Sequence, residues 1–571
     1  MQSTMMNVPL SLNHLLERAG TIFARNEVVS RLPDKSLRRH NYGQIYRRTR
    51  ALASALQKLG LKKGDRVATL CWNHHAHLEC YFGIPAAGGV MHTLNLRLAP
   101  GEIGAIAADA DDRFLVVDDV LLPLYRQFAA LHRFERVIVF PFSGAEMATD
   151  LDEVDHYEHL LDAADPDGFE YAAHAEDDPV SMCFTSGTTG RSKGVVYSHR
   201  STILHTLVGC LGDYWGLRGT DTVLPVTPMF HANCWGIPYA AMMMGVKLVF
   251  PGPHLHPDDL LDLMQIEPPT LSLGVPTIWM GLIQAYDRAL IEQPGRWKMP
   301  IGLRSLVGGA AVPESLIRAF ARHGVWLLQG WGMTETSPLA TVSYHRAECL
   351  DEGVEGRYRR AAMAGSPVPL VELRIRIDDK SDDKNDAGED DQNDRVDGPG
   401  SGPGGKGGQD APWDGKTMGE IQVRGPFITG SYHLAGAPAD KFTADGWLRT
   451  GDVATIDELA FVRITDRTKD LIKSGGEWIS SVDLENALMG HPAGAEAAVI
   501  AIPDEKWSER PLACIVWKAG QSATPAELGA QLLQAGFAKW QLPDRYEVIE
   551  AIPRTSTGKF WKLRLRERFV G

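Results

Sequence analysis

Strand-like runs alternate with helix-like stretches over residues 180–329, and this alternation is the feature that most limits the folds open to the chain. The runs are VSMCFT, TVLPVTP, VKLVF, PTLSLG, LRSLVGG and VWLLQG, separated by helical patterns such as the one over residues 313–322. Such alternation predicts a parallel sheet covered by helices. The pattern recurs over residues 65–118 with DRVATLCW, GGVMHTL and RFLVVDD, so the α/β prediction extends toward the N-terminus.

At 571 residues the chain is too long for one compact core, so we expect at least two domains. Residues 1–466 are interpreted as a large α/β domain with parallel and mixed sheets covered by helices. Within it, residues 378–417 are acidic, rich in Gly and nearly free of apolar side chains, which predicts a flexible surface insertion. Residues 467–571 are predicted to form a smaller α+β domain, joined by a hinge.

The composition excludes several classes of protein. The formal net charge is -14, and about half of it comes from residues 378–397, so nothing favours nucleic acid as a partner. The seven cysteines are scattered without a C-x-x-C pair, which is typical of buried thiols in a reducing compartment. No apolar run approaches the roughly twenty residues of a membrane span, and the N-terminus has no signal pattern. We therefore expect a cytoplasmic protein without a transmembrane segment.

The sequence TSGTTGRSKG at residues 185–194 directly follows the strand-like VSMCF and precedes a helical stretch that begins near His199. Small, hydroxyl-rich loops of this kind leave backbone N–H groups free to wrap a phosphate, and Lys193 adds positive charge. The spacing is not that of a P-loop, because the position five residues after Gly187 is Ser192 rather than Gly. The loop therefore predicts a phosphate site outside the P-loop class.

This segment resembles the phosphate loop of the adenylate-forming (AMP-binding) superfamily, which includes acyl-CoA synthetases, adenylation domains and beetle luciferases. Other motifs of the superfamily follow in the expected order. The resemblance implies ATP contacts from the phosphate loop (Thr185, Ser186, Gly187, Thr188, Thr189, Gly190, Lys193), the adenine face (Gly309, Ala310, Ala311), the adenine and magnesium motif (Gln329, Gly330, Trp331, Gly332, Met333, Thr334, Glu335), the ribose motif (Asp452) and the hinge, where Arg467 would contact the nucleotide and Lys469 would be the pivot.

The resemblance also implies the chemistry of the site. In the superfamily the Glu of the Thr-Glu pair holds Mg²⁺ and the Thr contacts the α-phosphate, roles that carry over to Glu335 and Thr334, with Thr185 as a second predicted magnesium ligand. The sequence PRTSTGK at residues 553–559 resembles the closing motif, whose lysine bridges the substrate carboxylate and the nucleotide. Lys559 is therefore the predicted main catalytic residue, because an ammonium group draws two anionic reactants together.

A second face is implied for thioester formation. In the superfamily the C-terminal domain rotates about the hinge, so that the closing lysine leaves and a second face enters the site. KSGG at residues 473–476 resembles that face, and Trp478 follows it. Lys473, Gly475, Gly476 and Trp478 are thus predicted to bind coenzyme A, since glycine leaves room for the pantetheine arm.

Two segments bear on the acid. PMFHANCW at residues 228–235 resembles the acyl-pocket motif, with His231 beside the reacting carboxylate and Trp235 gating the acyl tunnel; on one helix the two side chains would share a face. KSGGEWISSVDLE at residues 473–485 is close to the form in fatty acyl-CoA synthetases and related methylthiopropionate-CoA ligases. The resemblance implies an AMP-forming ligase for a medium- or long-chain fatty acid; the alternative is a short or thioether acid such as 3-methylthiopropionate.

Two other classes stay open. One is a luciferase-like oxygenase, against which the KSGG face speaks. The other is a non-catalytic binding protein. The presence of Lys559, Glu335 and Asp452 argues against this class, because a charged group is costly to bury unless it binds a ligand. The ligase reading implies a carboxylic acid, ATP, Mg²⁺ and coenzyme A as ligands. Related fatty acyl-CoA synthetases are often dimers, so a homodimer is expected by analogy.

Overall fold

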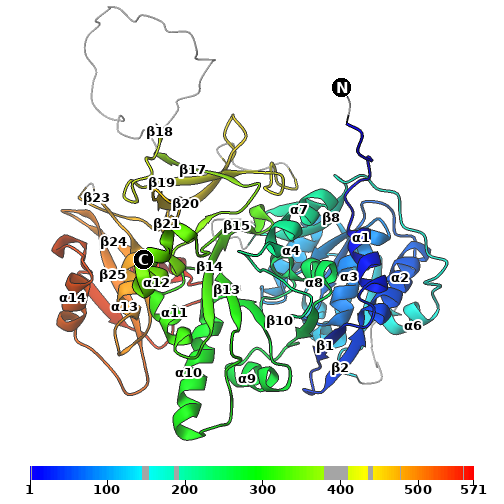
Figure 1. The fold of residues 1–571 in the computed structure, drawn as a ribbon, viewed down its shortest axis with the longest axis horizontal. Helices are drawn as coiled ribbons and strands as arrows, with labels where there is room; N and C mark the ends of the chain where they lie inside the picture. The colour runs from blue at the N-terminus through cyan, green and yellow to red at the C-terminus, as the bar shows by residue number, and fades with distance from the viewer. Residues whose placement is uncertain are drawn as a thin grey trace, which may run out of the picture.

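The computed structural model describes residues 1, 3–144, 154–185, 192–377, 409–434, 441–475, 477–556 and 558–570. Figure 1 shows two sheets with their helices in blue to green, a yellow antiparallel sheet beside them, and an orange to red C-terminal part packed near β14 and α12. In the described residues no helix has the length and apolar character required to cross a membrane. The predicted fold class, a large α/β part followed by a smaller α+β part, is confirmed.

The N-terminal sheet is parallel except at one edge. Its strands run in the order β7-β6-β5-β3-β4-β8-β9, and only the β8–β9 pair is antiparallel. The bounds are β3 (Arg66–Leu70), β4 (Val90–Thr93), β5 (Asp112–Asp118), β6 (Arg136–Phe140), β7 (Val154–His156), β8 (Pro179–Phe184) and β9 (Gly194–Ser198). The antiparallel pair flanks the predicted phosphate loop, so the described ends of that loop, Thr185 and Lys193, lie at a sheet edge.

The central sheet has a parallel interior and antiparallel edges, in the order β16-β15-β14-β13-β12-β10-β11-β1-β2. The bounds are β1 (Glu27–Arg31), β2 (Leu37–Asn41), β10 (Thr222–Pro225), β11 (Lys247–Phe250), β12 (Leu271–Gly274), β13 (Arg304–Gly308), β14 (Trp326–Gly332), β15 (Leu339–Val342) and β16 (Ser366–Pro367). The carboxyl ends of β13 and β14 lie side by side, because Gly308 pairs with Gly330. Two predicted nucleotide motifs are brought together at this edge.

Helices cover both sheets and fill the space between them. α3 (His75–Ala86) is buried along its whole length and contacts β1 of one sheet and β3, β4 and β8 of the other. It shares a core with α1 (Leu12–Thr21), α2 (Tyr42–Lys58), α7 (His199–Cys210) and α8 (Ile237–Met244). The outer faces are covered by α4 (Pro100–Ala110) and α5 (Leu122–Phe128), and by α9 (Pro257–Ile266), α10 (Pro276–Glu292) and α11 (Glu314–Ala321). Shorter helices are α6 (Tyr157–Asp162) and α12 (Gly353–Ala361).

Two further sheets follow. The antiparallel sheet runs β18-β17-β19-β20-β21, with β17 (Glu372–Ile377), β18 (Gln409–Asp410), β19 (Gly419–Arg424), β20 (Leu448–Ile456) and β21 (Val462–Arg467). The C-terminal sheet contains β22 (Ile472–Ser474), β23 (Glu477–Ile479), β24 (Gly494–Asp504), β25 (Ser508–Trp517) and β26 (Arg545–Val548). One face packs on α13 (Ser481–Met489) and α14 (Pro525–Gln534), the other on α15 (Lys562–Phe569). The domain boundary at 466 and 467 stays a prediction.

Two expectations change. The sequence suggests one sheet over residues 180–329, but VSMCF forms β8 and joins the N-terminal sheet, where it pairs with β4. All these runs are equally apolar, so pattern alone does not assign a strand to a sheet. Of the predicted insertion, residues 378–408 lie outside the described residues, and Gln409–Asp410 is not irregular but pairs with β17.

Candidate active site

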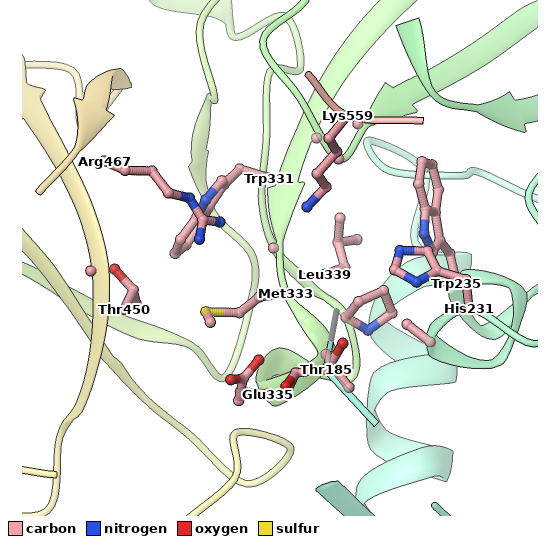
Figure 2. A pocket seen from close by; sticks show the side chains of 18 of the residues that line it. Thr185, His231, Trp235, Trp331, Met333, Glu335, Leu339, Thr450, Arg467 and Lys559 are labelled. Carbon is pink, nitrogen blue, oxygen red and sulfur yellow. The ribbon is translucent and has the colours of Figure 1, made fainter. Parts of the chain in front are cut away.

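A cavity of about 370 Å³ lies where the N-terminal sheet, the central sheet, the antiparallel sheet and the C-terminal part meet. Figure 2 shows its interior, with the Lys559 ammonium pointing inward from one side and Thr185 and Glu335 on the opposite side. The predicted site residues that line it are Thr185, Lys193, His231, Trp235, Gly309, Gly330, Trp331, Gly332, Met333, Thr334, Glu335, Arg467, Lys469 and Lys559. Motifs hundreds of residues apart therefore share one cavity.

The base of the phosphate loop is held by its own backbone. The Thr185 N–H donates to the Lys193 carbonyl at 2.9 Å, and the Lys193 N–H donates to the Thr185 hydroxyl at 3.1 Å. Ser186, Gly187, Thr188, Thr189 and Gly190 lie outside the described residues. The Lys193 ammonium lies 5.0 Å from the centre of the Tyr432 ring. The two ends of the loop thus place a hydroxyl and a cation at the cavity wall.

Glu335 lies in a short 3-10 turn, Thr334–Thr336, directly after β14, and is only 5% exposed. One carboxylate oxygen, Oε1, accepts a hydrogen bond from the Tyr432 hydroxyl at 2.7 Å. The Thr334 carbonyl accepts one from Tyr197 at 2.8 Å. A buried carboxylate beside a phosphate-type loop is a ligand of the kind that Mg²⁺ prefers.

Asp452 joins two of the lining side chains. Its Oδ2 accepts a hydrogen bond from the Trp331 indole at 2.9 Å, and its Oδ1 pairs with Nε of Arg467, also at 2.9 Å. The Asp452 charge is the main reason that the pKa of Arg467 is raised. Asp452 itself lies just behind the lining, whereas its neighbours Thr450 and Gly451 line the cavity. The two interactions of Asp452 hold Trp331 and Arg467 at the end of the cavity farthest from Trp235 in Figure 2.

Besides Asp452, three predicted nucleotide residues are not among the lining residues of the described chain: Gln329, Ala310 and Ala311. Gln329 is buried, and its Oε1 accepts a hydrogen bond from the Val312 N–H at 2.8 Å. Gln329 thereby holds the loop after β13, so its visible role is to shape the wall that Gly309 forms.

Lys559 enters the cavity on a tight turn of the C-terminal part. The Thr555 N–H donates to the Lys559 carbonyl at 2.8 Å, and the Lys559 N–H donates to the Thr555 hydroxyl at 3.2 Å. Burial and the charge of Arg467 lower the pKa of Lys559 to about 8, against the attraction of Asp452 and Glu335. Because Lys559 is buried and points into the cavity that the nucleotide motifs line, it is suited to binding an anion there.

His231 and Trp235 do not share a helix. The residues from Ala232 to Trp235 have φ values of 42° to 54°, so the chain makes a left-handed turn before α8. Each such non-glycine residue costs about 1–2 kcal/mol. Asn233 offsets part of this cost, because its amide donates to the Ser181 hydroxyl at 2.8 Å and its carbonyl oxygen accepts from Cys183. The strained turn nevertheless places both side chains on the cavity wall (Figure 2).

His231 is electrically neutral at ordinary pH. Burial lowers its pKa to about 3, and the charges of Lys559 and Arg97 contribute to the shift. A neutral imidazole next to a cationic lysine does not repel it, so the two can contact the same carboxylate.

The predicted thioester face lies outside the cavity. Gly475 has φ +62°, its N–H donates to the Trp507 carbonyl at 2.8 Å, and a Cβ there would lie 2.8 Å from the Trp507 ring. Lys473 places its ammonium 5.7 Å from the centre of the Trp478 ring, and Trp478 is 43% exposed. Gly476 lies outside the described residues. In this arrangement Lys559 lines the cavity, whereas Gly475 lies apart from it.

Several lining residues were not anticipated from the sequence. Lys441 lies near Glu335, Glu420 and Asp452, and burial lowers its pKa despite their attraction. Tyr432 and Trp215 also line the cavity. Lys441, Tyr432 and Trp215 lie outside the motifs quoted above, so no sequence signal marks them.

Comparison with known proteins places two family models on this chain. The AMP-binding enzyme family matches residues 17–394, and the AMP-binding enzyme C-terminal domain matches residues 483–559. A long-chain-fatty-acid–CoA ligase of Thermus thermophilus is 44% identical over 99% of this chain and 97% of its own. A 3-methylmercaptopropionyl-CoA ligase of Ruegeria lacuscaerulensis is 39% identical (100% and 99% covered), and a medium-chain-fatty-acid–CoA ligase of Ectopseudomonas oleovorans is 37% identical (100% and 98%).

Solved structures share the fold. The anthranilate CoA ligase AuaEII in complex with anthranoyl-AMP superposes with a TM-score of 0.81 at 22% identity, covering 100% of this chain and 99% of its own. ATP-bound MatB from Rhodopseudomonas palustris gives a TM-score of 0.78 at 23% identity, covering 98% and 99%.

Proposed function

This chain belongs to the AMP-binding enzyme family, and we propose that it is an ATP-dependent, AMP-forming acyl-CoA ligase that activates a medium- or long-chain fatty acid. The observation that carries the proposal is the meeting of Lys559 with Thr185, Glu335 and His231 in one cavity. The second candidate is a ligase for a short or thioether acid, favoured by the relative whose name specifies 3-methylmercaptopropionyl-CoA.

In the first half-reaction a carboxylate oxygen of the acid forms a bond to the α-phosphorus of ATP. The bond from that phosphorus to the bridging oxygen of pyrophosphate breaks, and pyrophosphate leaves with the electron pair. No proton is transferred. Lys559 would offset the repulsion between the two anions, and His231, a neutral group that lines the same cavity, would lie beside the carboxylate.

Glu335 and Thr185 are the residues that would hold Mg²⁺. The Glu335 carboxylate is buried and has a hydrogen bond to Tyr432 at one oxygen, which leaves its other oxygen suited to a hard cation. A magnesium ion there would offset charge on the phosphates as pyrophosphate leaves. Lys193 and Arg467 contribute positive charge on the same cavity wall.

In the second half-reaction the thiolate of coenzyme A attacks the acyl carbonyl carbon and AMP leaves. Lys473, Gly475, Gly476 and Trp478 would guide the thiol, but the described ones lie outside the cavity. The proposal therefore requires a rotation of the C-terminal part about the segment that contains Lys469. We place this chemistry in the cytoplasm, in keeping with seven free cysteines, and we retain a homodimer as the expected assembly.

The test is release of AMP and pyrophosphate by the purified protein with ATP and magnesium, with and without coenzyme A, on straight-chain, thioether and aromatic acids. A coenzyme-A-stimulated signal that peaks on medium or long chains supports the first proposal; a peak on 3-methylthiopropionate moves the assignment to the second. In Lys559→Ala, adenylation should fall by at least about a hundredfold, while thioester formation from presynthesised acyl-adenylate should be largely retained. Equal loss in both half-reactions would contradict the assigned role.

A further inference from the structure

The acyl end of the cavity is lined by aromatic and aliphatic side chains. His231 and Trp235 lie at the end opposite Arg467 and Thr450 in Figure 2, which leaves that end for the acid. Among the lining residues, Trp215, Trp235, Leu306 and Leu339 are apolar and at most 7% exposed. The cavity of about 370 Å³ must hold the nucleotide and the acyl chain together. Cavities that enclose one drug-sized ligand are about 300–1,000 Å³, so this cavity is near the small end of that range for a nucleotide and an acyl chain together.

Trp215 is a bulky residue of this wall that lies outside the motifs identified in the sequence. It lies in the segment between α7 and β10 and is 1% exposed. The backbone N–H of Trp215 donates to the Gly209 carbonyl at 3.0 Å, and its backbone carbonyl accepts from the Arg304 guanidinium, also at 3.0 Å. Arg304 is itself paired with Asp221 at 2.7 Å. The backbone that carries the indole is thus held at both sides.

Two glycines make the slot in which the indole sits. A Cβ at Gly209 would lie 2.2 Å from the six-membered ring of Trp215, and a Cβ at Gly236 would lie 3.2 Å from the same ring. Gly236 directly follows Trp235, so the indole lies next to the strained turn of the acyl motif. The ring also meets His205 edge to face, with centroids 5.6 Å apart, and His205 Nε2 accepts from the Leu339 N–H at 3.2 Å. Trp215, His205 and Leu339 therefore form one packed wall.

We propose that Trp215 closes the acyl end of this cavity and limits the length of the chain that it accepts, so that the protein takes short- and medium-chain acids in preference to long ones. The inference rests on the proposed ligase function; it keeps the medium-chain acids of the first candidate and the short acids of the second, and excludes long chains as preferred substrates. The indole already packs against Gly209, Gly236 and His205, so an acyl chain that pushes it outward must displace packed atoms.

The test is kcat/KM for butanoate, hexanoate, octanoate, dodecanoate and hexadecanoate in the wild type and in Trp215→Leu. We expect the wild type to lose at least about tenfold between octanoate and dodecanoate, since a misfitting methylene alone changes the rate constant by about tenfold or more. In Trp215→Leu the dodecanoate to octanoate ratio should rise at least about tenfold. Trp215→Phe is a milder change that keeps an aromatic ring, so it should raise the dodecanoate to octanoate ratio by less. This variant provides the test if Trp215→Leu does not fold.

The matched control is Trp297→Leu. Trp297 is also buried, at 4% exposure, but belongs to the core beneath α9 and α10, so its loss should leave the chain-length ratio unchanged. A wild type that prefers dodecanoate or hexadecanoate, or Trp215 variants with an unshifted ratio, would overturn the role of Trp215 alone. A folded wild type that releases no AMP with any acid would overturn the ligase proposal itself, so the two failures are distinguishable.

Discussion

The side-chain amide of Asn95 donates a hydrogen bond to the hydroxyl of Ser556 at 3.0 Å, across 461 positions of the chain. Ser556 belongs to the turn that carries Lys559 into the cavity. Two positions on, Gly558 has φ +86°, and a Cβ there would lie 3.3 Å from Thr277 and 3.4 Å from Val275. The turn therefore docks closely against the large α/β part, and the Asn95–Ser556 bond holds it there.

Asn95→Ala should slow adenylation about fivefold, because a neutral hydrogen bond of this kind contributes about 1 kcal/mol. The measurement is pyrophosphate release with a saturating acid. Ser556→Ala should have the same effect, and the double variant should be little worse than either single one, since both remove one interaction. Thioester formation from acyl-adenylate is the internal control; a matching loss there would mean that the bond does not act through docking.

The adenylation step should lose activity as the pH rises through about 8. Burial lowers the pKa of Lys559 to about 8, and the ammonium is the form that attracts the carboxylate, so kcat/KM for the acid falls on the alkaline side. Lys559→Arg should act more slowly but lose this alkaline limb, because guanidinium stays charged. The measurement is the pH profile of pyrophosphate release; an unchanged limb in the Arg variant would assign it to another group. His231, with a pKa of about 3, should add no limb near neutral pH.

Lys562 and Glu485 form a buried pair in the C-terminal part, with Nζ and Oε1 2.7 Å apart and side chains only 11% and 8% exposed. Lys562→Met should lower the free energy of unfolding by about 3–5 kcal/mol, because it leaves the Glu485 carboxylate buried without its cation. Adding Glu485→Gln should recover much of the loss, since the amide oxygen can still accept from the Val499 N–H, now bonded to Glu485 at 2.7 Å. Urea unfolding measures both; a double variant no more stable than Lys562→Met would contradict this account.

Residues 378–408 should be dispensable for catalysis. Ile377 and Gln409 are direct partners across antiparallel β17 and β18, so a two-residue Asn-Gly turn can replace the whole segment. Within the described chain, no residue of these two strands lines the cavity. We expect kcat/KM within about twofold of the wild type, because exposed turn replacements usually have small effects. A folded deletion protein that loses most of its activity would show that the segment takes part in function.

The motif residues were predictable from the sequence, because the chemistry of phosphate and carboxylate binding demands particular residue types in a short, ordered pattern. Thr185, Glu335 and Lys559 were identified because their motifs resemble those of the AMP-binding superfamily, and all three line the cavity. The turn at residues 232–235 was not predictable, since a left-handed run of non-glycine residues opposes local preference and persists only through contacts such as Asn233 to Ser181. Lys441 and Trp215 were likewise missed, because they belong to no short pattern.

By itself the sequence determined the α/β class, the family and the residues able to handle phosphate and carboxylate, because periodicity and motif chemistry are local properties of the chain. Only the tertiary structure decided that β8 joins the N-terminal sheet, that Lys559 and not Gly475 faces the cavity, and that Trp215 lines it. Those outcomes depend on which distant surfaces pack together and on the space left between them, and packing of that kind is a property of the whole fold.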